Sequence, residues 1–320
     1  MTLPKTETYT QIMLDRRLRT AVTTVAALAV LTLSPLGAQP SQPNQRSMYV
    51  SVLNDAGAPV PNLGPSDFMV REDNVAREVL HVGPATEPMQ IALLVDNSQS
   101  ARPFIIDIRN ALQEFVTTMG APSDAAGARN ELAIIALADR PTTLTDFTVS
   151  RAQLLKGIDR IFSVPQAGTL LLEGIIDTSK MLKKRDARRP VIVAVTTDGP
   201  ELSDRYYDLV LGPLKESGAA FHAITIGGLR GSLGEGARDR DMVLDRGTSD
   251  SGGRRDNVLS GMALRPKFKE LADELTHQYR VTYAHPQSLI PPEHVTVSAT
   301  RPGLTARGTL AKEPRLVAKP

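Results

Sequence analysis

The sequence predicts an α/β fold: a doubly wound, mostly parallel sheet, with a small accessory β-domain formed by the N- and C-terminal segments. Continuous apolar runs at 91–95 and 190–197 are typical of strands covered on both faces. Apolar residues at helical spacing lie between such runs, and this order requires crossover connections and a parallel sheet. Alternating apolar and polar residues flank the region on both sides, as half-buried antiparallel strands do.

Composition excludes several classes of site. The chain has no cysteine, so disulfides, zinc–thiolate centres, iron–sulfur clusters and thiol nucleophiles are excluded. Its 320 residues carry a formal net charge of +2, which gives no indication of a nucleic-acid partner. The basic cluster KKRDARRP at 183–190 is expected to be the exposed end of a helix, where cations complement the helix dipole.

Residues 1–38 are predicted to be a secretory signal peptide. Positive charge at 15–20 precedes an apolar run at 21–33, and small residues around Ala38 fit a cleavage site. An uncleaved membrane anchor is the alternative, although the run is shorter than the roughly 20 residues of a membrane span. The true start is Met1 or Met13. This leader predicts an extracytoplasmic location, periplasmic or secreted, and contact with a membrane only through the leader itself.

The segments that flank the predicted parallel sheet are expected to fold together. Residues 39–87 form about three short antiparallel strands, separated by turns in NDAGAPV and REDNVAR. Residues 286–320 alternate again in EHVTVSAT and GLTARGTL. Neither half has enough apolar surface for a stable sheet, so we expect the C-terminal strands to pair with the N-terminal ones.

Strands and helices alternate in the central region, residues 88–285. We expect, in order, a strand at 91–95, a helix at 103–119, a hairpin of strands at 131–138 and 141–148, helices at 151–162 and 170–184, a strand at 190–197, a helix at 204–217, a strand at 220–227 and a helix at 266–278. Gly218 is a suitable left-handed end for the helix before it. The Gly-, Asp- and Arg-rich segment 227–261 is predicted to be a flexible loop.

Polar side chains directly follow two of the apolar runs. Asp96 ends the first run and Asp198 ends the run at 190–197, while Ser98 and Ser100 alternate after Asp96 and Thr169 opens a helix. Ligands of parallel sheets bind beyond the carboxyl ends of the strands, so we expect the three loops to converge. All five side chains offer oxygen, the donor that Mg²⁺, Mn²⁺ and Ca²⁺ prefer. Ser100 is also expected to cap the following helix.

In order and spacing, DNSQS at 96–100, Thr169 and Asp198 resemble the metal-ion-dependent adhesion site (MIDAS) of von Willebrand factor A domains. The resemblance covers about residues 88–285. It implies a divalent cation, usually Mg²⁺ with Mn²⁺ or Ca²⁺ as alternatives, and a partner protein that supplies Asp or Glu. The metal ligands that it implies are Asp96, Ser98, Ser100, Thr169 and Asp198. Gln99 stands where the family often has glycine.

The flanking segments resemble exported bacterial proteins grouped as von Willebrand A-related acidobacterial domain proteins. The resulting hypothesis is an exported, non-enzymatic protein-binding or adhesion module with no catalytic residues. The alternatives are an envelope structural or assembly protein with a metal-free A domain, and a metal-dependent hydrolase. The hydrolase is disfavoured, since Ser98 stands where aspartate phosphatases place a second Asp and no nucleophile elbow or phosphate loop occurs. Glu173 is expected either to reach the metal through water or to favour its helix N-terminus.

Overall fold

A six-stranded, mostly parallel sheet forms the centre of the computed structural model, which describes residues 44–121, 127–227, 235–286 and 290–312. Its strands lie in the order β10 (Arg255–Val258), β9 (Ala220–Ile226), β8 (Pro190–Thr197), β5 (Gln90–Val95), β6 (Glu131–Ala136) and β7 (Thr142–Thr148). All neighbours are parallel except β6 and β7, which pair antiparallel as the predicted hairpin does. The predicted signal peptide, residues 1–38, lies outside the described residues.

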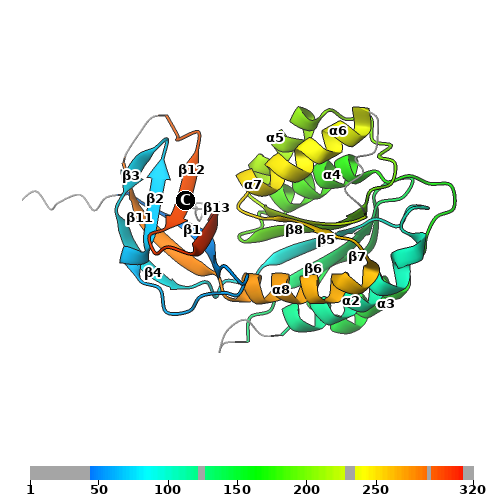
Figure 1. Ribbon diagram of the computed structural model, residues 1–320, viewed down its shortest axis with the longest axis horizontal. Coiled ribbons are helices and arrows are strands. Elements are labelled where there is room, and N and C mark those ends of the chain that lie inside the picture. Colours follow the sequence, from blue (N-terminus) through cyan, green and yellow to red (C-terminus); the bar gives the residue numbers. More distant parts are fainter. Residues whose placement is uncertain (1–43, 122–126, 228–234, 287–289, 313–320) are drawn as a thin grey trace, which may run out of the picture. The chain divides into compact units, whose positions relative to one another are not determined.

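Helices cover both faces of this sheet, as predicted (Figure 1). One face packs against α2 (Ile105–Met119), α3 (Arg151–Asp159) and α8 (Leu264–Thr276). The other face lies under α4 (Leu171–Lys184), α5 (Tyr207–Ser217), α6 (Glu235–Met242) and α7 (Thr248–Asp250). α5 ends at Gly218 in the left-handed conformation, as expected. Within the described ranges, no helix is long and apolar enough to span a membrane.

The order of the strands reverses at β5. The next strands in the chain, β6 and β7, lie on one side of it, and the later strands β8, β9 and β10 lie on the other. A reversal of this kind leaves a crevice at the carboxyl ends of the neighbouring strands, because the crossovers leave in opposite directions. We call this side of the sheet the carboxyl edge. Asp96 follows β5 and Asp198 follows β8, so both stand at this edge.

The accessory domain consists of two antiparallel sheets around a core of their own. One sheet has the order β13 (Leu304–Leu310), β1 (Asn44–Asn54), β11 (Tyr279–His285) and β4 (Val79–Pro84); the other has β12 (Val295–Ala299), β2 (Phe68–Glu72) and β3 (Val75–Arg77). The 3₁₀ turn η1 (Pro65–Asp67) precedes β2. The predicted pairing of N- and C-terminal segments is confirmed by β1 with β13 and β2 with β12.

β11 lies within the predicted range of the parallel domain but belongs to the accessory sheet. It pairs antiparallel with β1 and β4. Tyr279, Val281 and Tyr283 are buried and alternate with more exposed residues, and this period of two suits an antiparallel strand with one face on a core. The described parallel domain therefore ends with α8.

The basic cluster 183–190 lies at the end of α4 and four of its cations are exposed, as expected, but the side chain of Arg189 is buried. The guanidinium donates hydrogen bonds to the backbone oxygens of Ala85, Glu87 and Leu275 and to Oε1 of Gln278. These acceptors lie where the chain passes between the accessory strands and the central sheet. Four oxygen partners compensate the desolvation of the charge, which a helix-end pattern in the sequence does not reveal.

Two further expectations were wrong. Much of the predicted flexible loop 227–261 is ordered as α6, the π-helix η3 (Val243–Gly247), α7 and β10. Val243 and Leu244 of η3 are buried on one face of the sheet, and β10 pairs with β9. Residues 228–234 lie outside the described residues. Ser100 caps no helix: α2 begins with Phe104 at its N-cap, after the 3₁₀ turn η2 (Arg102–Phe104) that contains Pro103.

His222 on β9 is buried, and neither ring nitrogen has a hydrogen-bond partner among the described residues. Burial lowers its pKa from 6.5 to about 4, against the opposing field of Glu274. Between these values the unfolded chain takes up a proton that the folded chain excludes, so stability falls as pH falls. We expect His222 to cost about 2 kcal/mol of unfolding free energy between about pH 6.5 and 5.

Urea unfolding at both pH values tests this expectation. His222→Leu removes the titrating group, so the wild type must lose about 2 kcal/mol more than the variant on acidification. The same loss in both proteins would show that other groups cause the acid sensitivity.

Candidate functional site

Asp96 is fully buried at the end of β5 and is held by three strong hydrogen bonds. Its Oδ1 accepts from the backbone N–H of Ser98 at 2.9 Å. Its Oδ2 accepts from the backbone N–H and the hydroxyl of Thr197, at 3.0 and 2.8 Å. The carboxylate therefore ties the end of β5 to the end of β8 and fixes the turn in which Ser98 lies.

Backbone hydrogen bonds join the three predicted loops at the carboxyl edge. The amide of Gln99 donates to Ala167 O at 2.9 Å, and the amide of Thr169 donates to Pro200 O at 3.0 Å. Gln99, at the position where the family often has glycine, is exposed and its Oε1 accepts from the amide of Gln166. The loops that carry Asp96, Thr169 and Asp198 are thus in contact, as their order at the sheet edge predicts.

Two hydroxyl groups in these loops are buried without a hydrogen-bond partner among the described residues. They are Oγ of Ser98, in a residue 1% exposed, and Oγ1 of Thr169, in a residue 0% exposed. A buried polar atom without a partner costs free energy, and in native structures it indicates a water or ion. The two hydroxyls are therefore suited to an ion that accepts oxygen lone pairs.

Ser100 and Asp198 are placed by glycines in the neighbouring loops. Ser100 is half-buried, and its hydroxyl lies so close to Gly199 that a Cβ atom there would overlap it. The exposed carboxylate of Asp198 lies equally close to Gly227, whose φ of +146° favours glycine. No hydrogen bond or ion pair links the carboxylates of Asp96 and Asp198 within the part of the chain that the structure describes. The Asp96 carboxylate already accepts three hydrogen bonds, whereas the side-chain oxygens of the other four predicted donors have no hydrogen-bond partner among the described residues.

Residues 91–201 match the family model of the von Willebrand factor type A domain. The chain contains a von Willebrand factor type A domain. All five predicted metal ligands lie in the matched part of this A domain: Asp96, Ser98, Ser100, Thr169 and Asp198. No curated protein matches the chain.

Several solved structures are similar to this chain at low sequence identity. The von Willebrand factor type A protein from Catenulispora acidiphila is 12% identical over 86% of this chain and 74% of that chain, with a TM-score of 0.47. The vWF domain of the type V pili tip protein Mfa5 from Porphyromonas gingivalis is 14% identical over 60% of this chain and 96% of that chain, with a TM-score of 0.46. A mutant of the PilB minor pilin from Streptococcus sanguinis is 11% identical over 60% of this chain and 62% of that chain, with a TM-score of 0.42.

Two charged residues beside the A-domain loops were missed from the sequence. Glu201 is buried next to Thr169, with which it forms a backbone β-bridge, and burial raises its pKa to about 7. Arg240 of α6 is also buried and donates hydrogen bonds to the backbone oxygens of Thr197 and Gly199, on either side of Asp198. The sequence could have indicated Glu201, because it stands only three residues after Asp198. Nothing in the sequence indicated that Arg240 lies near the site, because its segment was predicted to be a flexible loop.

Replacement of Arg240 tests its role in holding the Asp198 loop. Arg240→Met removes both hydrogen bonds and the positive charge that opposes the rise of the Glu201 pKa, so we expect the unfolding free energy to fall by about 2 kcal/mol. Amide exchange at residues 197–201 should become faster than in the wild type. Unchanged exchange in these residues would show that Arg240 supports the fold without positioning the loop.

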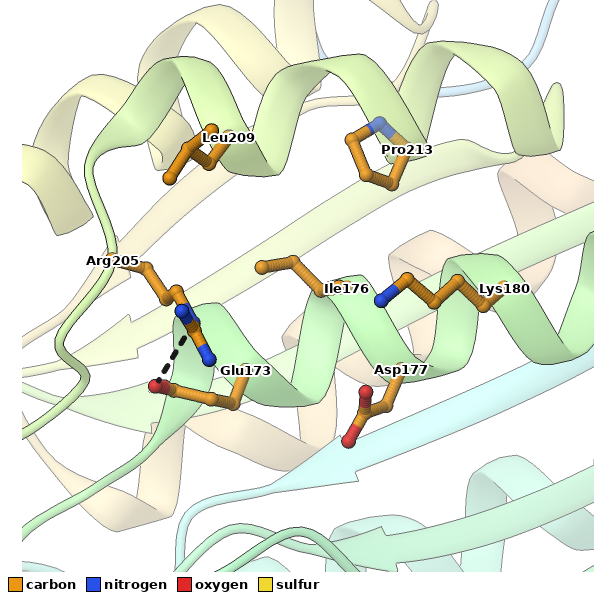
Figure 2. A pocket seen from close by; sticks show the side chains of 7 residues that line it. All are labelled: Glu173, Ile176, Asp177, Lys180, Arg205, Leu209 and Pro213. Carbon is orange, nitrogen blue, oxygen red and sulfur yellow. Dashed lines mark ion pairs between the residues drawn. The ribbon is translucent and has the colours of Figure 1, made fainter.

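Glu173 points into an open groove between α4 and α5 of the A domain (Figure 2). The groove has a volume of about 270 Å³ and is lined by charged side chains of both signs together with Ile176, Leu209 and Pro213. Glu173 pairs with Arg205 at 3.6 Å across it. Glu173 stands in the first turn of α4, as one of its two predicted roles requires, and the ion pair with Arg205 is a further role that was not predicted.

Among the described residues, no three His, Asp or Glu side chains come close enough to hold a metal ion together. Any ion at the carboxyl edge of the A domain must therefore take hydroxyl oxygens in addition to carboxylates. The five predicted residues supply that mixture, with two carboxylates and three hydroxyls.

Proposed function

We propose that the A domain binds a divalent cation at the carboxyl edge and uses it to capture a carboxylate of a partner protein. The donors are Asp96, Ser98, Ser100, Thr169 and Asp198. The observation that carries the proposal is the pair of buried hydroxyls, Ser98 Oγ and Thr169 Oγ1, which have no other partner in the described part of the chain.

The chemistry of the donors supports a hard cation such as Mg²⁺, with Mn²⁺ or Ca²⁺ as alternatives. The two carboxylates and three hydroxyls offer five oxygens but only two formal negative charges. Two formal charges balance those of a divalent cation, but five protein oxygens leave one position of an octahedral shell open, and a carboxylate oxygen from a partner can occupy it. Asp198 is exposed, so the donor set borders on solvent. We therefore assign the site to non-enzymatic binding.

We also propose that the protein is exported and acts outside the cytoplasm, on the strength of the leader pattern in residues 1–38. The β-strands on both sides of the A domain support assignment to the von Willebrand A-related acidobacterial type, in which the A domain lies between β segments. Mass spectrometry of the protein from its native host tests export, because cleavage after Ala38 leaves a mature chain that starts at Gln39.

Calorimetric titration of the full chain with MnCl₂ and MgCl₂ tests cation binding, and Ser98→Ala is the matched variant. Ser98 Oγ has no partner among the described residues, so its removal should leave the fold intact and weaken cation binding by about tenfold or more. Carboxylate capture is tested by adding acetate or neutral acetamide to the Mn²⁺-loaded protein. Acetate should displace a coordinated water and lower the water-proton relaxation rate, and acetamide should leave this rate unchanged. Absence of heat with either salt would favour the metal-free structural alternative, and equal effects of acetate and acetamide would contradict carboxylate capture.

A further inference from the structure

Large hydrophobic side chains are exposed in unusual density at the carboxyl edge. Seven described side chains of this type are at least 60% exposed, and six of them lie on loops or helix starts at this edge. We call these six the apolar rim: Ile106 (72%), Phe162 (62%), Leu202 (60%), Tyr206 (66%), Leu259 (81%) and Met262 (80%). Single exposed hydrophobics are ordinary, but a group of them on one surface indicates an interaction site.

Two members of the apolar rim adjoin the loops that carry the candidate ligands. The backbone oxygen of Phe162 accepts from Nδ2 of Asn97 at 2.9 Å, directly beside Asp96. The side chain of Leu202 lies over Gly168, and its amide donates to Thr169 O at 2.8 Å. Apolar surface therefore begins next to the loops of Ser98 and Thr169, two of the three predicted hydroxyl donors.

Other members adjoin the loop of Asp198 and the start of α2. The amide of Gly227, against which the Asp198 carboxylate lies, donates to Val258 O, and Leu259 follows directly. Gly261 contacts the Asp107 side chain, which brings the loop of Leu259 and Met262 beside Ile106. The apolar rim thus approaches the candidate metal site from two directions.

Arg102 adds a free cation to the same surface. It is exposed, two residues after Ser100, and its guanidinium makes no hydrogen bond or ion pair with another described residue. Exposed arginines without acidic partners attract negatively charged ligands. The surface therefore combines apolar contacts with positive charge near the candidate donors.

On the basis of the proposed function, we infer that the partner presents an Asp or Glu flanked on both sides by apolar residues. The carboxylate reaches the cation site, and the flanking side chains cover the apolar rim. Burial of such side chains adds affinity and selects among the many acidic segments that the cation alone would accept.

A protein segment fits this surface better than a lipid bilayer. Insertion of the apolar rim into a membrane would also bury the exposed carboxylate of Asp198, which has no hydrogen bond or ion pair of its own in the described residues. A peptide whose carboxylate binds the cation does not require the Asp198 carboxylate to enter an apolar environment. A membrane and a second copy of the chain are therefore treated as alternative outcomes of the test.

Selection from a random peptide library displayed on phage provides that test. The immobilised full chain is exposed to the library in MnCl₂, and phage are eluted with EDTA. We expect eluted peptides to contain Asp or Glu with apolar residues on both sides, and synthetic versions to bind about tenfold more tightly than versions with Gly and Ser flanks. The double variant Leu259→Ser, Met262→Ser should lose this preference and keep its affinity for Mn²⁺.

Ile290→Ser is the matched control, because Ile290 is 78% exposed and lies outside the apolar rim. It should select the same peptides as the wild type. Selection of acidic peptides without apolar flanks would overturn the inference and leave the proposed function standing. If the protein does not bind Mn²⁺, or if EDTA elutes no enriched peptide, both are overturned. Flotation with phosphatidylglycerol vesicles, or a dimer in sedimentation, that is lost in the double variant would reassign the apolar rim to a membrane or to a second copy.

Discussion

Thr169→Val is expected to stabilise the metal-free protein and to abolish most of its cation binding. Valine has nearly the shape of threonine, and the Thr169 hydroxyl is buried without a partner among the described residues. Its removal should raise the unfolding free energy in EDTA by about 1 kcal/mol, because an unsatisfied polar atom disappears. The loss of a direct ligand should weaken Mn²⁺ binding by about 100-fold. Urea unfolding in EDTA and calorimetry with MnCl₂ measure the two effects.

Thr178→Val is the control for this experiment. Thr178 lies on α4, is 1% exposed, and its hydroxyl is likewise buried without a described partner. The same substitution should therefore stabilise the protein by a similar amount and leave Mn²⁺ binding unchanged. Equal effects of the two variants on cation binding, or no effect of either, would contradict the assignment of Thr169.

Glu274→Gln is expected to cause the largest loss of stability. Glu274 on α8 is 1% exposed and forms ion pairs with Arg307 of β13 at 2.8 Å and with Arg254 at 3.5 Å. Loss of one member of a buried ion pair leaves the other charge without compensation. We expect the unfolding free energy to fall by about 3 kcal/mol, with faster amide exchange in β13, which this contact holds to α8.

Glu216→Gln makes the same chemical change at the surface. Glu216 pairs with Lys183 at 2.7 Å, but both side chains are more than half exposed. This variant should lose less than about 1 kcal/mol, because water screens an exposed pair. If the two variants lose similar amounts of unfolding free energy, burial does not strengthen the contribution of the Glu274 ion pairs to stability.

The architecture could be predicted from sequence because its signals are local. The continuous apolar runs that became β5 and β8 report burial on both faces, and helical spacing reports the covering helices. The positions of Asp96 and Asp198 at the carboxyl edge follow from the direction of these strands. The contact between their loops depends on strand order, which the family resemblance implied.

The missed features depend on long-range partners. Arg189 is buried because oxygens of Ala85, Glu87, Leu275 and Gln278 meet it, and no local pattern encodes such a meeting. Val243 and Leu244 belong to a short apolar stretch, 242–244, that is too brief to indicate a helix in a polar segment, yet they fix η3 on the sheet. Arg240 was missed for the same reason, since its segment was expected to lack structure.

The most direct measurement is anomalous diffraction from crystals of the protein soaked in MnCl₂. We predict one anomalous peak at the carboxyl edge, within about 2.0–2.6 Å of oxygens that include Ser98 Oγ and Thr169 Oγ1, and its absence in Thr169→Val crystals. A peak elsewhere, or an empty edge in crystals whose loops are not covered by lattice contacts, would contradict the cation site and with it the proposed capture of a partner carboxylate.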